Sequence, residues 1–458
     1  MEVPIAALQS MRQYFNTGAA LSYAFRKQQL LFLQKAISKY EKKISDALYT
    51  DMKKSAEEAY ASETGLLLAE IDTTLKHLQA WMKPKSVSTN LVNFPSTSKI
   101  YRDPLGVVLI IAPWNYPVQL SFAPLIGAIA GGNCAVVKPS ELAPASAVVI
   151  TRIITETFPP DYIRVVPGDG SEIIPRMMKI FRFDHVFYTG SFAVGKLIYQ
   201  MAATDLVPVT LELGGKSPVI IEKDANLEVA ARRVALAKFT NAGQTCIAPD
   251  YLLVHNNNKE KFIALLKKSI SKFYTLDASN SYDYSKIIND KRFDTLTSYL
   301  QQGNIIYGGE FNREKLYIAP TLIEDASFNS PLMKEEIFGP ILPVFGFNAH
   351  EDAFDIVQRN PNPLAFYLFT NDAQVEKNWL LKLPFGGGCV NNCIWHFTNH
   401  HLPFGGVGAS GIGAYHGKFS FDLFTRAKPV MKTPTWLDPD IKYPSFKGKL
   451  GLFKRLIG

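Results

Sequence analysis

Two residues of this 458-residue chain have surroundings that suit covalent chemistry. Glu212 lies between Leu211 and Leu213 and is followed directly by two glycines. A carboxylate in an apolar setting is costly unless it has a partner or a function, and burial raises its pKa towards the range useful to a general base. Cys246 follows the glycine-containing segment 239–245, which predicts a loop that presents the thiol. These residues are candidates for a base and a reactive thiol.

The remaining cysteines favour a reducing environment and give no sign of a disulfide framework. Cys134, Cys389 and Cys393 are the only others in the chain, and four cysteines are too few to staple a protein of this length. Most isolated cysteines are inert core residues, which is the interpretation of these three. Their small number favours catalysis at Cys246 over disulfide formation.

Two short motifs could bind a dinucleotide. Gly190 and Ser191 open a helical segment, where a tight turn and free N–H groups attract a pyrophosphate. Lys138 and Glu141 follow the neighbouring strand candidate, and a carboxylate there can accept both ribose hydroxyls. Each motif alone is also typical of a structural cap or a solvated turn, and no G-x-G-x-x-G loop follows the first strand candidate, at residues 107–112. On neighbouring strands of one sheet the two motifs support each other.

The elements that must position these residues can be predicted from periodicity. Apolar residues recur at helical spacing over residues 30–48 and 68–82, and a polar connecting arm follows at residues 85–102. Helical segments at 144–158 and 192–203 then alternate with β-branched strand candidates at residues 107–112, 134–138, 162–166, 185–188 and 207–211. This alternation predicts a parallel doubly wound sheet, whose ligands bind at the carboxyl ends of strands. It resumes over residues 218–391 and predicts a second α/β domain.

Composition excludes several classes of protein. The chain is 47% hydrophobic and 20% charged, which is ordinary for a globular protein. Its net charge of +8 is dispersed, so we expect no nucleic-acid partner. The longest apolar stretch, residues 107–112, is far shorter than the roughly 20 residues of a membrane-spanning helix. The N-terminal residues lack the pattern of a signal peptide, so a cytoplasmic location is expected.

Two further features of the sequence allow more than one interpretation. The segment 442–458 contains five basic residues among apolar ones and no acid, which fits either a solvated tail or a weak anchor on a membrane surface. His396, His400, His401 and His416 cluster late in the chain. Their irregular spacing does not fit a zinc site, so we expect no metal.

Seven motifs in order carry a resemblance to a known family. The sequences PWNYP, KPSE, TGSFAVG, LELGGKSP, NAGQTC, EEIFGP and PFGG resemble those of the aldehyde dehydrogenase superfamily over nearly the whole chain. The separation of Glu212 and Cys246, 246 − 212 = 34 residues, is similar to the family's spacing of base and nucleophile. The PWNYP form and the segment that begins at PFGG resemble the class 3 or fatty-aldehyde branch.

The resemblance implies a fold and a division of the chain. It implies an α/β, aldehyde dehydrogenase-like fold with two doubly wound domains, for cofactor and catalysis, and a small β oligomerisation arm. The dinucleotide-binding domain would comprise residues 1–84 and 104–211, and the catalytic domain residues 212–408. The arm would comprise residues 85–103 and 425–434, and residues 435–458 would form a basic tail. A homodimer held by the arm is implied.

The resemblance also implies a role for each site residue. Cys246 would attack the aldehyde as nucleophile, the Asn115 amide and the Cys246 N–H would stabilise the oxyanion, and Glu212 would activate water to hydrolyse the thioester. The residues implied in binding NAD or NADP are Lys138, Glu141, Gly190, Ser191, Gly214, Glu336 and Phe338. Lys216 would have only a supporting role, and Glu335 would be solvated.

The implied reaction is oxidation of an aliphatic (medium or long-chain) or aromatic aldehyde to the carboxylic acid. Tyr116 and Phe404 are candidates for the wall of a substrate tunnel, although ordinary core packing explains them equally well. Three alternatives stay open at this point. They are an enzyme that passes the acyl group to coenzyme A, a non-catalytic structural or binding homologue, and a Cys-His thiol hydrolase. The presence of Glu212 speaks against the first, because coenzyme A acylation needs no water-activating base.

Overall fold

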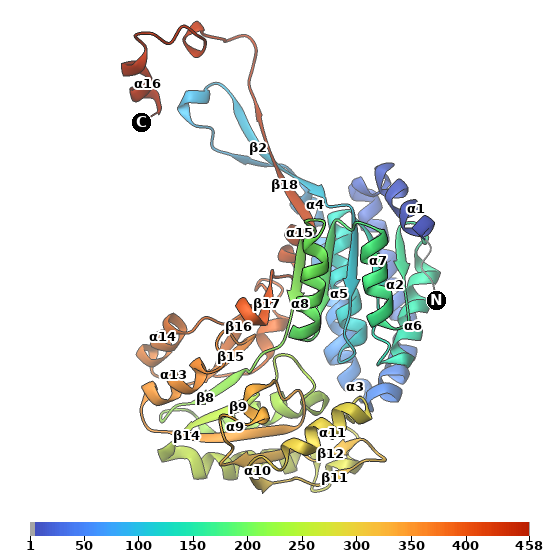
Figure 1. Ribbon diagram of the computed structural model, residues 1–458, viewed down its shortest axis with the longest axis vertical. Coiled ribbons are helices and arrows are strands. Elements are labelled where there is room, and N and C mark those ends of the chain that lie inside the picture. Colours follow the sequence, from blue (N-terminus) through green and yellow to red (C-terminus); the bar gives the residue numbers. More distant parts are fainter. Residues whose placement is uncertain (1–4, 458) are drawn as a thin grey trace.

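The computed structural model describes residues 5–457. Residues 1–4 and 458, which belong to the first and last expected segments, lie outside the described residues. Figure 1 shows two sheet-containing bodies stacked along the long axis, with a narrow arm that projects from the body nearer the N-terminus. Each body has its own hydrophobic core.

The first body is built on a six-stranded sheet in the order β17-β7-β6-β3-β4-β5. Five of its strands are parallel, and only β17 runs antiparallel to its neighbour β7. The strands are β3 (Val107–Ile111), β4 (Cys134–Lys138), β5 (Ile163–Val165), β6 (His185–Thr189), β7 (Val209–Glu212) and β17 (Gly411–Ile412). Because β7 extends through Glu212, the candidate base is the last residue of a buried strand.

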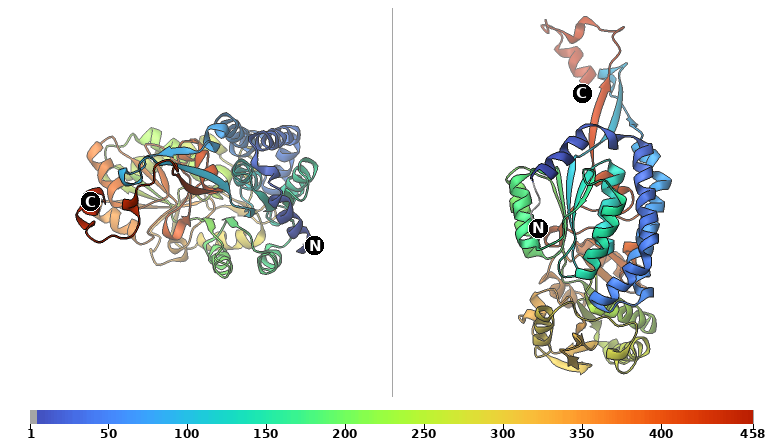
Figure 2. Two further views of the ribbon diagram at one scale, coloured as in Figure 1. Left: turned by 90° about the horizontal axis from the view of Figure 1, so that it is seen from above. Right: turned by 90° about the vertical axis from the view of Figure 1, so that its right-hand side faces the viewer.

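Helices cover both faces of this sheet, as a doubly wound arrangement requires (Figure 2). One group contains α2 (Tyr23–Met52), α4 (Gly65–Met82), α5 (Pro117–Gly131) and α6 (Pro144–Thr157), which pack against one another. The others are α1 (Ile5–Asn16), α3 (Ala56–Ala59), α7 (Gly170–Ile180) and α8 (Phe192–Ala203). The six apolar positions expected to form one helix face are all buried in α2, namely Leu30, Leu33, Ile37, Tyr40, Ile44 and Leu48.

The second body has a seven-stranded sheet in the order β10-β13-β14-β9-β8-β15-β16, and only β10 is antiparallel. Its strands are β8 (Pro218–Ile221), β9 (Tyr251–His255), β10 (Asn304–Tyr307), β13 (Thr321–Glu324), β14 (Ile341–Phe347), β15 (Ala365–Phe369) and β16 (Gly387–Val390). Its main helices are α9 (Leu227–Phe239), α10 (Lys259–Tyr274), α11 (Asp290–Tyr299), α13 (His350–Gln358) and α14 (Ala373–Lys382). The expectation of two α/β units is confirmed.

The arm is a three-stranded antiparallel sheet of β1 (Lys85–Val87), β2 (Thr97–Pro104) and β18 (Thr425–Lys432). Strand β18 pairs with β2 of the same chain over its full length. The terminal strand of the arm thus pairs within the chain. Beyond it the tail ends in α16 (Leu450–Ile457). Across residues 5–457, the long helices are too polar and the apolar ones too short to cross a bilayer.

The segment between the PFGG motif and β18 packs into the first body. Strand β17 lies beside β7, and α15 (Lys418–Leu423) packs on α5. Tyr415, Phe421 and Phe424 are buried in the first core. The division made from sequence stopped at residue 408 and resumed at 425, so these residues were assigned to no unit.

A left-handed glycine at the end of α5 provides a test of this packing. Gly132 has φ +85°, and an added Cβ would lie 2.5 Å from the guanidinium of buried Arg26. Arg26 donates to the carbonyls of Ala20 (2.9 Å) and Ala130 (3.0 Å). We expect Gly132→Ala to lower the free energy of unfolding by at least about 1 to 2 kcal/mol through backbone strain alone, as measured by urea denaturation.

The matched control is Gly451→Ala in α16, where nothing lies within 4 Å of an added Cβ. This change should leave the denaturation midpoint unchanged. Equal stability of the Gly132→Ala variant and the parent chain would contradict the assigned packing of Arg26.

Candidate active site

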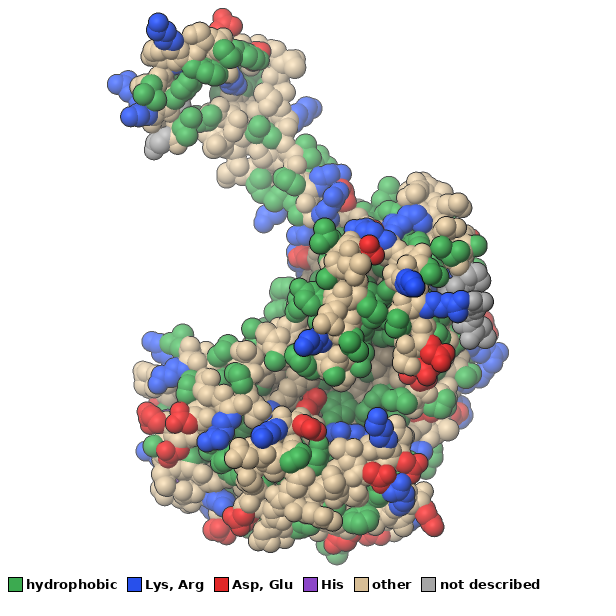
Figure 3. Space-filling view, in the orientation of Figure 1, with side chains coloured by type: hydrophobic (Ala, Val, Ile, Leu, Met, Phe, Trp, Pro, Cys, Tyr) green, Lys and Arg blue, Asp and Glu red, His purple; other side chains and the backbone are tan. Residues whose placement is uncertain are grey.

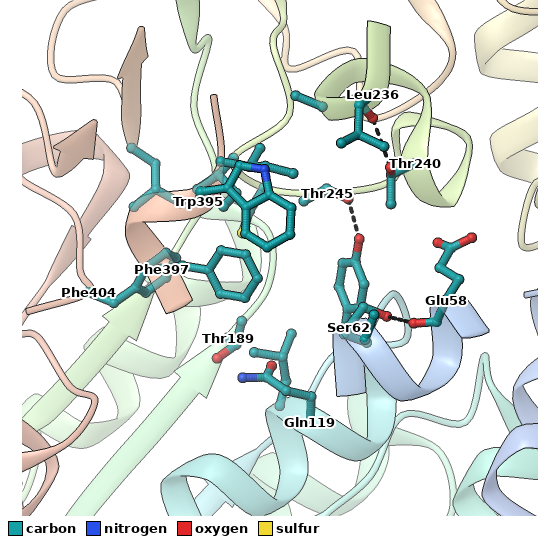
Figure 4. A pocket seen from close by; sticks show the side chains of 18 of the residues that line it. Glu58, Ser62, Gln119, Thr189, Leu236, Thr240, Thr245, Trp395, Phe397 and Phe404 are labelled. Atoms are coloured by element: carbon teal, nitrogen blue, oxygen red, sulfur yellow. Dashed lines mark hydrogen bonds between the residues drawn. The ribbon is translucent and has the colours of Figure 1, made fainter. Parts of the chain in front are cut away.

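A cavity of about 620 Å³ lies between the two bodies and contains both candidate reactive groups. Its wall receives side chains from the α3 region, from α5, from the ends of β6 and β7, from α9 and from the segment after β16 (Figure 4). Most of the wall is apolar, with Leu120, Leu236, Phe273, Ile394, Trp395 and Phe404 among its residues. Tyr116 and Phe404, the expected wall candidates, both line it.

Cys246 lies on a loop that the backbone holds in an unusual conformation. After α9, Asn241, Ala242 and Gly243 all have positive φ values, of 52°, 50° and 74°. A Cβ on Gly243 would lie 2.3 Å from the Gly339 carbonyl oxygen, so this position requires glycine. Left-handed residues cost free energy and persist where the surroundings determine them, often at functional sites.

Gln244 ties this loop to its surroundings. It is fully buried, and its amide nitrogen donates to the carbonyls of Asn241 and Lys286, both at 3.0 Å. Its amide oxygen accepts from the Ile288 N–H at 3.0 Å. Cys246, two residues further on, is therefore presented from a fixed loop.

The thiol of Cys246 is half-buried in the cavity wall. Burial raises the pKa of this thiol well above its ordinary value, and the nearby carboxyls of Glu336 and Glu212 raise it further. The thiol is thus protonated at neutral pH unless a positive charge comes close to it.

Glu212 lines the same cavity and has no partner for its carboxyl. The residue is 3% exposed, and neither side-chain oxygen has a hydrogen bond within the described part of the chain. Burial raises the pKa of this carboxyl well above its ordinary value. The apolar setting that the sequence predicted is present, and the residue lines the same cavity as Cys246.

Asn115 contacts the Cys246 loop directly. It is 3% exposed, and its side-chain nitrogen donates to the Gln244 carbonyl at 3.1 Å. Its own carbonyl accepts from the side chains of Asn241 (3.0 Å) and Lys54 (3.3 Å). The next residue, Tyr116, shares a 2.7 Å hydrogen bond with the Thr245 hydroxyl. Asn115 and Cys246 are thus brought together, 131 positions apart in sequence.

The expected adenosine and pyrophosphate residues lie at the carboxyl ends of β4 and β6. Lys138 is buried and donates to the Pro139 carbonyl (3.0 Å) and to the Glu141 carboxylate, which is partly exposed. Ser191 caps α8 by accepting from the Val194 N–H. A Cβ on Gly190 would lie 2.3 Å from the Tyr188 hydroxyl, so glycine is needed at this turn.

The expected nicotinamide side of the site is formed after α12 (Pro331–Lys334). The pKa of the Glu336 carboxyl is raised to about 8, chiefly by burial and then by Asp250. A Cβ on Gly214 would lie 2.0 Å from a carboxylate oxygen of Glu336, so glycine here makes room for that side chain. Phe338, with φ 47°, packs edge-on against Trp114 at 5.3 Å between ring centroids.

Lys216 and Glu335 are placed as the sequence analysis expected. Lys216 is buried, and its ammonium donates to Asp250 (2.5 Å) and to the Glu335 carbonyl (2.9 Å). Lys216 therefore links its own segment to those that carry Asp250 and Glu335, and it is not part of the cavity wall. The Glu335 side chain is exposed and accepts from the Tyr299 hydroxyl at 2.8 Å.

These residues fit a dinucleotide. A partly exposed carboxylate at the end of β4 suits ribose hydroxyls, and the start of α8 presents N–H groups to a pyrophosphate. The Glu336 carboxyl, beside Gly214, is a second acceptor for a ribose. All are found at strand ends or loops on the side of the sheet where Glu212 ends β7.

Comparison with known proteins identifies the family. The family model described as "Aldehyde dehydrogenase family" matches residues 4–430. The chain belongs to the aldehyde dehydrogenase family.

Individual relatives agree with this assignment. The chain is 48% identical to the "4,4'-diaponeurosporen-aldehyde dehydrogenase" of Staphylococcus aureus over 97% of this chain and 96% of that protein. It is 42% identical to the "Aldehyde dehydrogenase, dimeric NADP-preferring" of Rattus norvegicus, over 92% of each.

Solved structures give the same result. The substrate-bound state of Staphylococcus aureus AldH is similar to the whole chain, with a TM-score of 0.97 and 46% identity, and is covered in full. An NAD+ complex of a Bacillus cereus aldehyde dehydrogenase is similar over 93% of this chain and 88% of that one, with a TM-score of 0.84 and 27% identity. The protein is an aldehyde dehydrogenase, an oxidoreductase that oxidises aldehydes with NAD or NADP. The fold, enzyme class and cofactors expected from sequence are confirmed.

Three of the four histidines that cluster in sequence have structural partners for their side chains. His400 shares a 2.6 Å hydrogen bond with Glu70, and both His416 and His396 stack on Phe404. In residues 5–457, no group of three or more His, Cys, Asp or Glu residues is arranged to hold a metal ion.

Several wall and support residues were missed by the sequence analysis. Glu58 lines the cavity, accepts from the Asn241 N–H at 3.0 Å, and has a pKa raised to about 7 by burial. Lys238 is fully buried below the Cys246 loop, and Lys54 pairs with Glu63. A charged residue at a helix position gives no sequence signal of burial, so only its tertiary contacts reveal it.

The raised pKa of Cys246 predicts its reactivity. Only the thiolate is alkylated, so the rate of reaction with iodoacetamide should increase about tenfold per pH unit from pH 7 to 9 without a plateau. Because Glu336 and Glu212 contribute to the shift, Glu336→Gln should increase the rate at a given pH. Peptide mass spectrometry separates Cys246 from Cys389. A plateau below pH 8 would contradict the environment described.

Proposed function

We propose that Cys246 is the nucleophile, Glu212 the general base and Asn115 an oxyanion donor in the oxidation of apolar aldehydes to carboxylic acids. The observation that carries this proposal is one apolar cavity that contains both a half-buried thiol and a buried carboxyl without a partner. A carboxyl left unpaired in such a place is unfavourable for stability, which points to a chemical role.

In the first step the Cys246 sulfur, as a thiolate whose proton has passed to water, attacks the carbonyl carbon. A C–S bond forms, the carbonyl π electrons move to oxygen, and a tetrahedral thiohemiacetal oxyanion results. The Asn115 amide and the Cys246 N–H are the donors for this oxyanion. Loss of one such donor typically lowers the rate by about 10² to 10³.

Lys138, Glu141, Gly190 and Ser191 would hold the adenosine and pyrophosphate part of the cofactor. Gly214, Glu336 and Phe338 would hold the nicotinamide part. When bound, oxidised NAD or NADP supplies a hydride acceptor and a positive charge. That charge opposes the effects of burial on Cys246 and Glu212, because an opposite charge favours an anionic form.

In the last step Glu212 takes a proton from water, which attacks the thioester carbon. The C–S bond breaks, the sulfur leaves with the electron pair and regains a proton, and the carboxylic acid is released. The raised pKa of Glu212 makes its carboxylate a stronger base than an exposed one. Its oxygens, without other partners, are available to orient this water.

The substrate we propose is a medium-chain or long-chain aliphatic aldehyde, or an aromatic one. The apolar wall supports this, since it offers rings and branched aliphatic groups from several elements (Figure 4). The similar Staphylococcus aureus protein is named for 4,4'-diaponeurosporen-aldehyde. We extend the apolar character of that aldehyde to the substrate of this chain.

We also propose the division of the chain that the resemblance implied. Residues 1–84 and 104–211 form the dinucleotide-binding domain, and residues 212–408 form the catalytic domain. The protein is proposed to be a cytoplasmic homodimer. The arm residues 85–103 and 425–434 support dimerisation, because β18 is exposed along nearly all of its length. The similar rat protein is named as dimeric.

For the tail we propose weak contact with an anionic membrane surface. It stands away from both bodies, and hydrophobic side chains gather on it among lysines and arginines (Figure 3). Its exposed large apolar residues include Trp436, Leu437, Tyr443, Phe446, Leu450, Leu452 and Ile457. Basic residues between apolar ones favour such a surface.

The role of Glu212 can be tested by rapid-mixing measurements of reduced cofactor. Glu212→Gln should release one burst of reduced cofactor per active site and then stall, with steady-state turnover lowered about 10²-fold or more. Cys246→Ser should show no burst while the cofactor still binds. Normal turnover of either variant would contradict its assigned role.

Coenzyme A should not accelerate turnover of the parent enzyme, and strong acceleration would favour acyl transfer to coenzyme A instead.

The tail can be tested by co-sedimentation with phosphatidylserine-rich vesicles. We expect the full chain to bind them, less so at high salt, and a chain lacking residues 435–458 not to bind. Light scattering should give a dimer for both chains. Equal binding of the two chains, or no binding of the full chain, would rule out membrane contact through the tail.

A further inference from the structure

An ion pair is completely buried behind the wall of the active-site cavity. Lys54 and Glu63 are 2.7 Å apart, and both side chains are 0% exposed. A buried pair rarely improves stability over apolar residues of similar size, because both charges lose their hydration. The position of this pair therefore calls for an explanation other than stability.

Glu63 holds the start of the helix that follows Asn115. One carboxylate oxygen accepts from Lys54, and the other accepts from the N–H groups of Val118 (2.9 Å) and Gln119 (3.1 Å). These N–H groups belong to the first turn of α5, where a negative charge is favourable. Glu63 itself lies in a single π-helical turn, Tyr60–Thr64, an irregularity that is frequent at functional sites.

Lys54 holds Asn115 itself. Its ammonium donates to the Asn115 carbonyl at 3.3 Å and lies 4.1 Å from the centroid of the Tyr116 ring. From the other body, the Asn241 amide donates to the same carbonyl at 3.0 Å. The backbone of Asn115 is thus held between the N-terminal region and the Cys246 loop.

We propose that Lys54 and Glu63 are positioning residues for the oxyanion site. Glu63 fixes the first turn of α5, Lys54 fixes the carbonyl that precedes it, and together they set the direction of the Asn115 side-chain amide. The inference rests on the proposed role of Asn115 as oxyanion donor. Neither residue would touch the substrate.

A double variant separates positioning from stability. Lys54→Met alone would leave Glu63 charged and without its partner, which destabilises the fold. Lys54→Met with Glu63→Gln leaves neither position of the pair charged, and the glutamine oxygen can still accept from the first turn of α5. The double variant should therefore recover much of the melting temperature lost in the single variant, while Asn115 still lacks its charged donor.

The readout is the burst of reduced cofactor at saturating aldehyde, for which amplitude counts competent active sites and the rate constant reports chemistry. We expect the double variant to keep the burst amplitude and the cofactor affinity. Its burst rate constant should fall about 10- to 100-fold, because small displacements of a catalytic group lower the rate by such factors. A burst rate constant within about twofold of the parent enzyme would overturn the proposal.

Two further variants complete the experiment. Lys53→Met is the matched control. Lys53 also donates to two backbone carbonyls, those of Ser279 and Ser281, but these lie away from Asn115. The burst of this variant should equal that of the parent enzyme. Asn115→Ala tests the proposed function on which the inference rests. If it leaves the burst unchanged, the oxyanion role fails and this inference with it. If Asn115→Ala slows the burst and the double variant does not, only the positioning role fails.

Discussion

The burial of acidic groups in and beside one apolar cavity is the constraint on which the rest of the site depends. Cys246, Glu212 and Glu336 all have pKa values raised chiefly by burial, and the charge of each carboxylate also disfavours the thiolate. Their anionic forms become accessible only beside a positive charge or strong donors. Two cations of the protein lie behind the wall: Lys54 is paired with Glu63, and the pKa of Lys238 is lowered to about 8, mainly by burial. Lys272 lines the cavity but is exposed to solvent, which screens its charge. A bound oxidised cofactor would add a further positive charge at the site.

This constraint explains why the site is built on irregular backbone. Donors and nucleophile must be fixed before the reaction, because a preorganised site needs no rearrangement when charge develops. Positive φ values at Asn241, Ala242 and Gly243, the π-helical turn that carries Glu63, and the bonds of Gln244 all restrict the same small region. Regular strands and helices contribute only their ends, such as Glu212 at the end of β7.

Local pattern predicted the elements well, singled out two candidate residues that line one cavity, and predicted long-range contacts poorly. Strand β4 and helix α8 have the expected bounds because alternation of apolar runs and a Gly-Ser turn are local signals. Glu212 was found because its immediate neighbours are leucines and glycines. Lys54 and Glu63 were not, because Lys54 lies in the connection between α2 and α3 and Glu63 follows nine positions later among polar residues. Nothing local marks either residue as buried, since the burial depends on α5. For the same reason residues 409–424, whose core contacts are all distant in sequence, were assigned to no unit.

The same burial also accounts for selectivity between hydrolysis and other fates of the thioester. An apolar wall admits little water, so the thioester that we propose on Cys246 would meet chiefly the water that a polar group holds nearby. Glu212 is the buried carboxyl of the wall whose oxygens are both without a partner in the described residues, whereas Glu58 is engaged with the Asn241 N–H. Desolvation thus has two effects. It raises the basicity of Glu212, and it leaves little other water to reach the thioester. A more polar wall would weaken both effects. The binding of apolar substrates and the hydrolysis of the thioester therefore depend on the same property of the cavity, the apolar character of its wall.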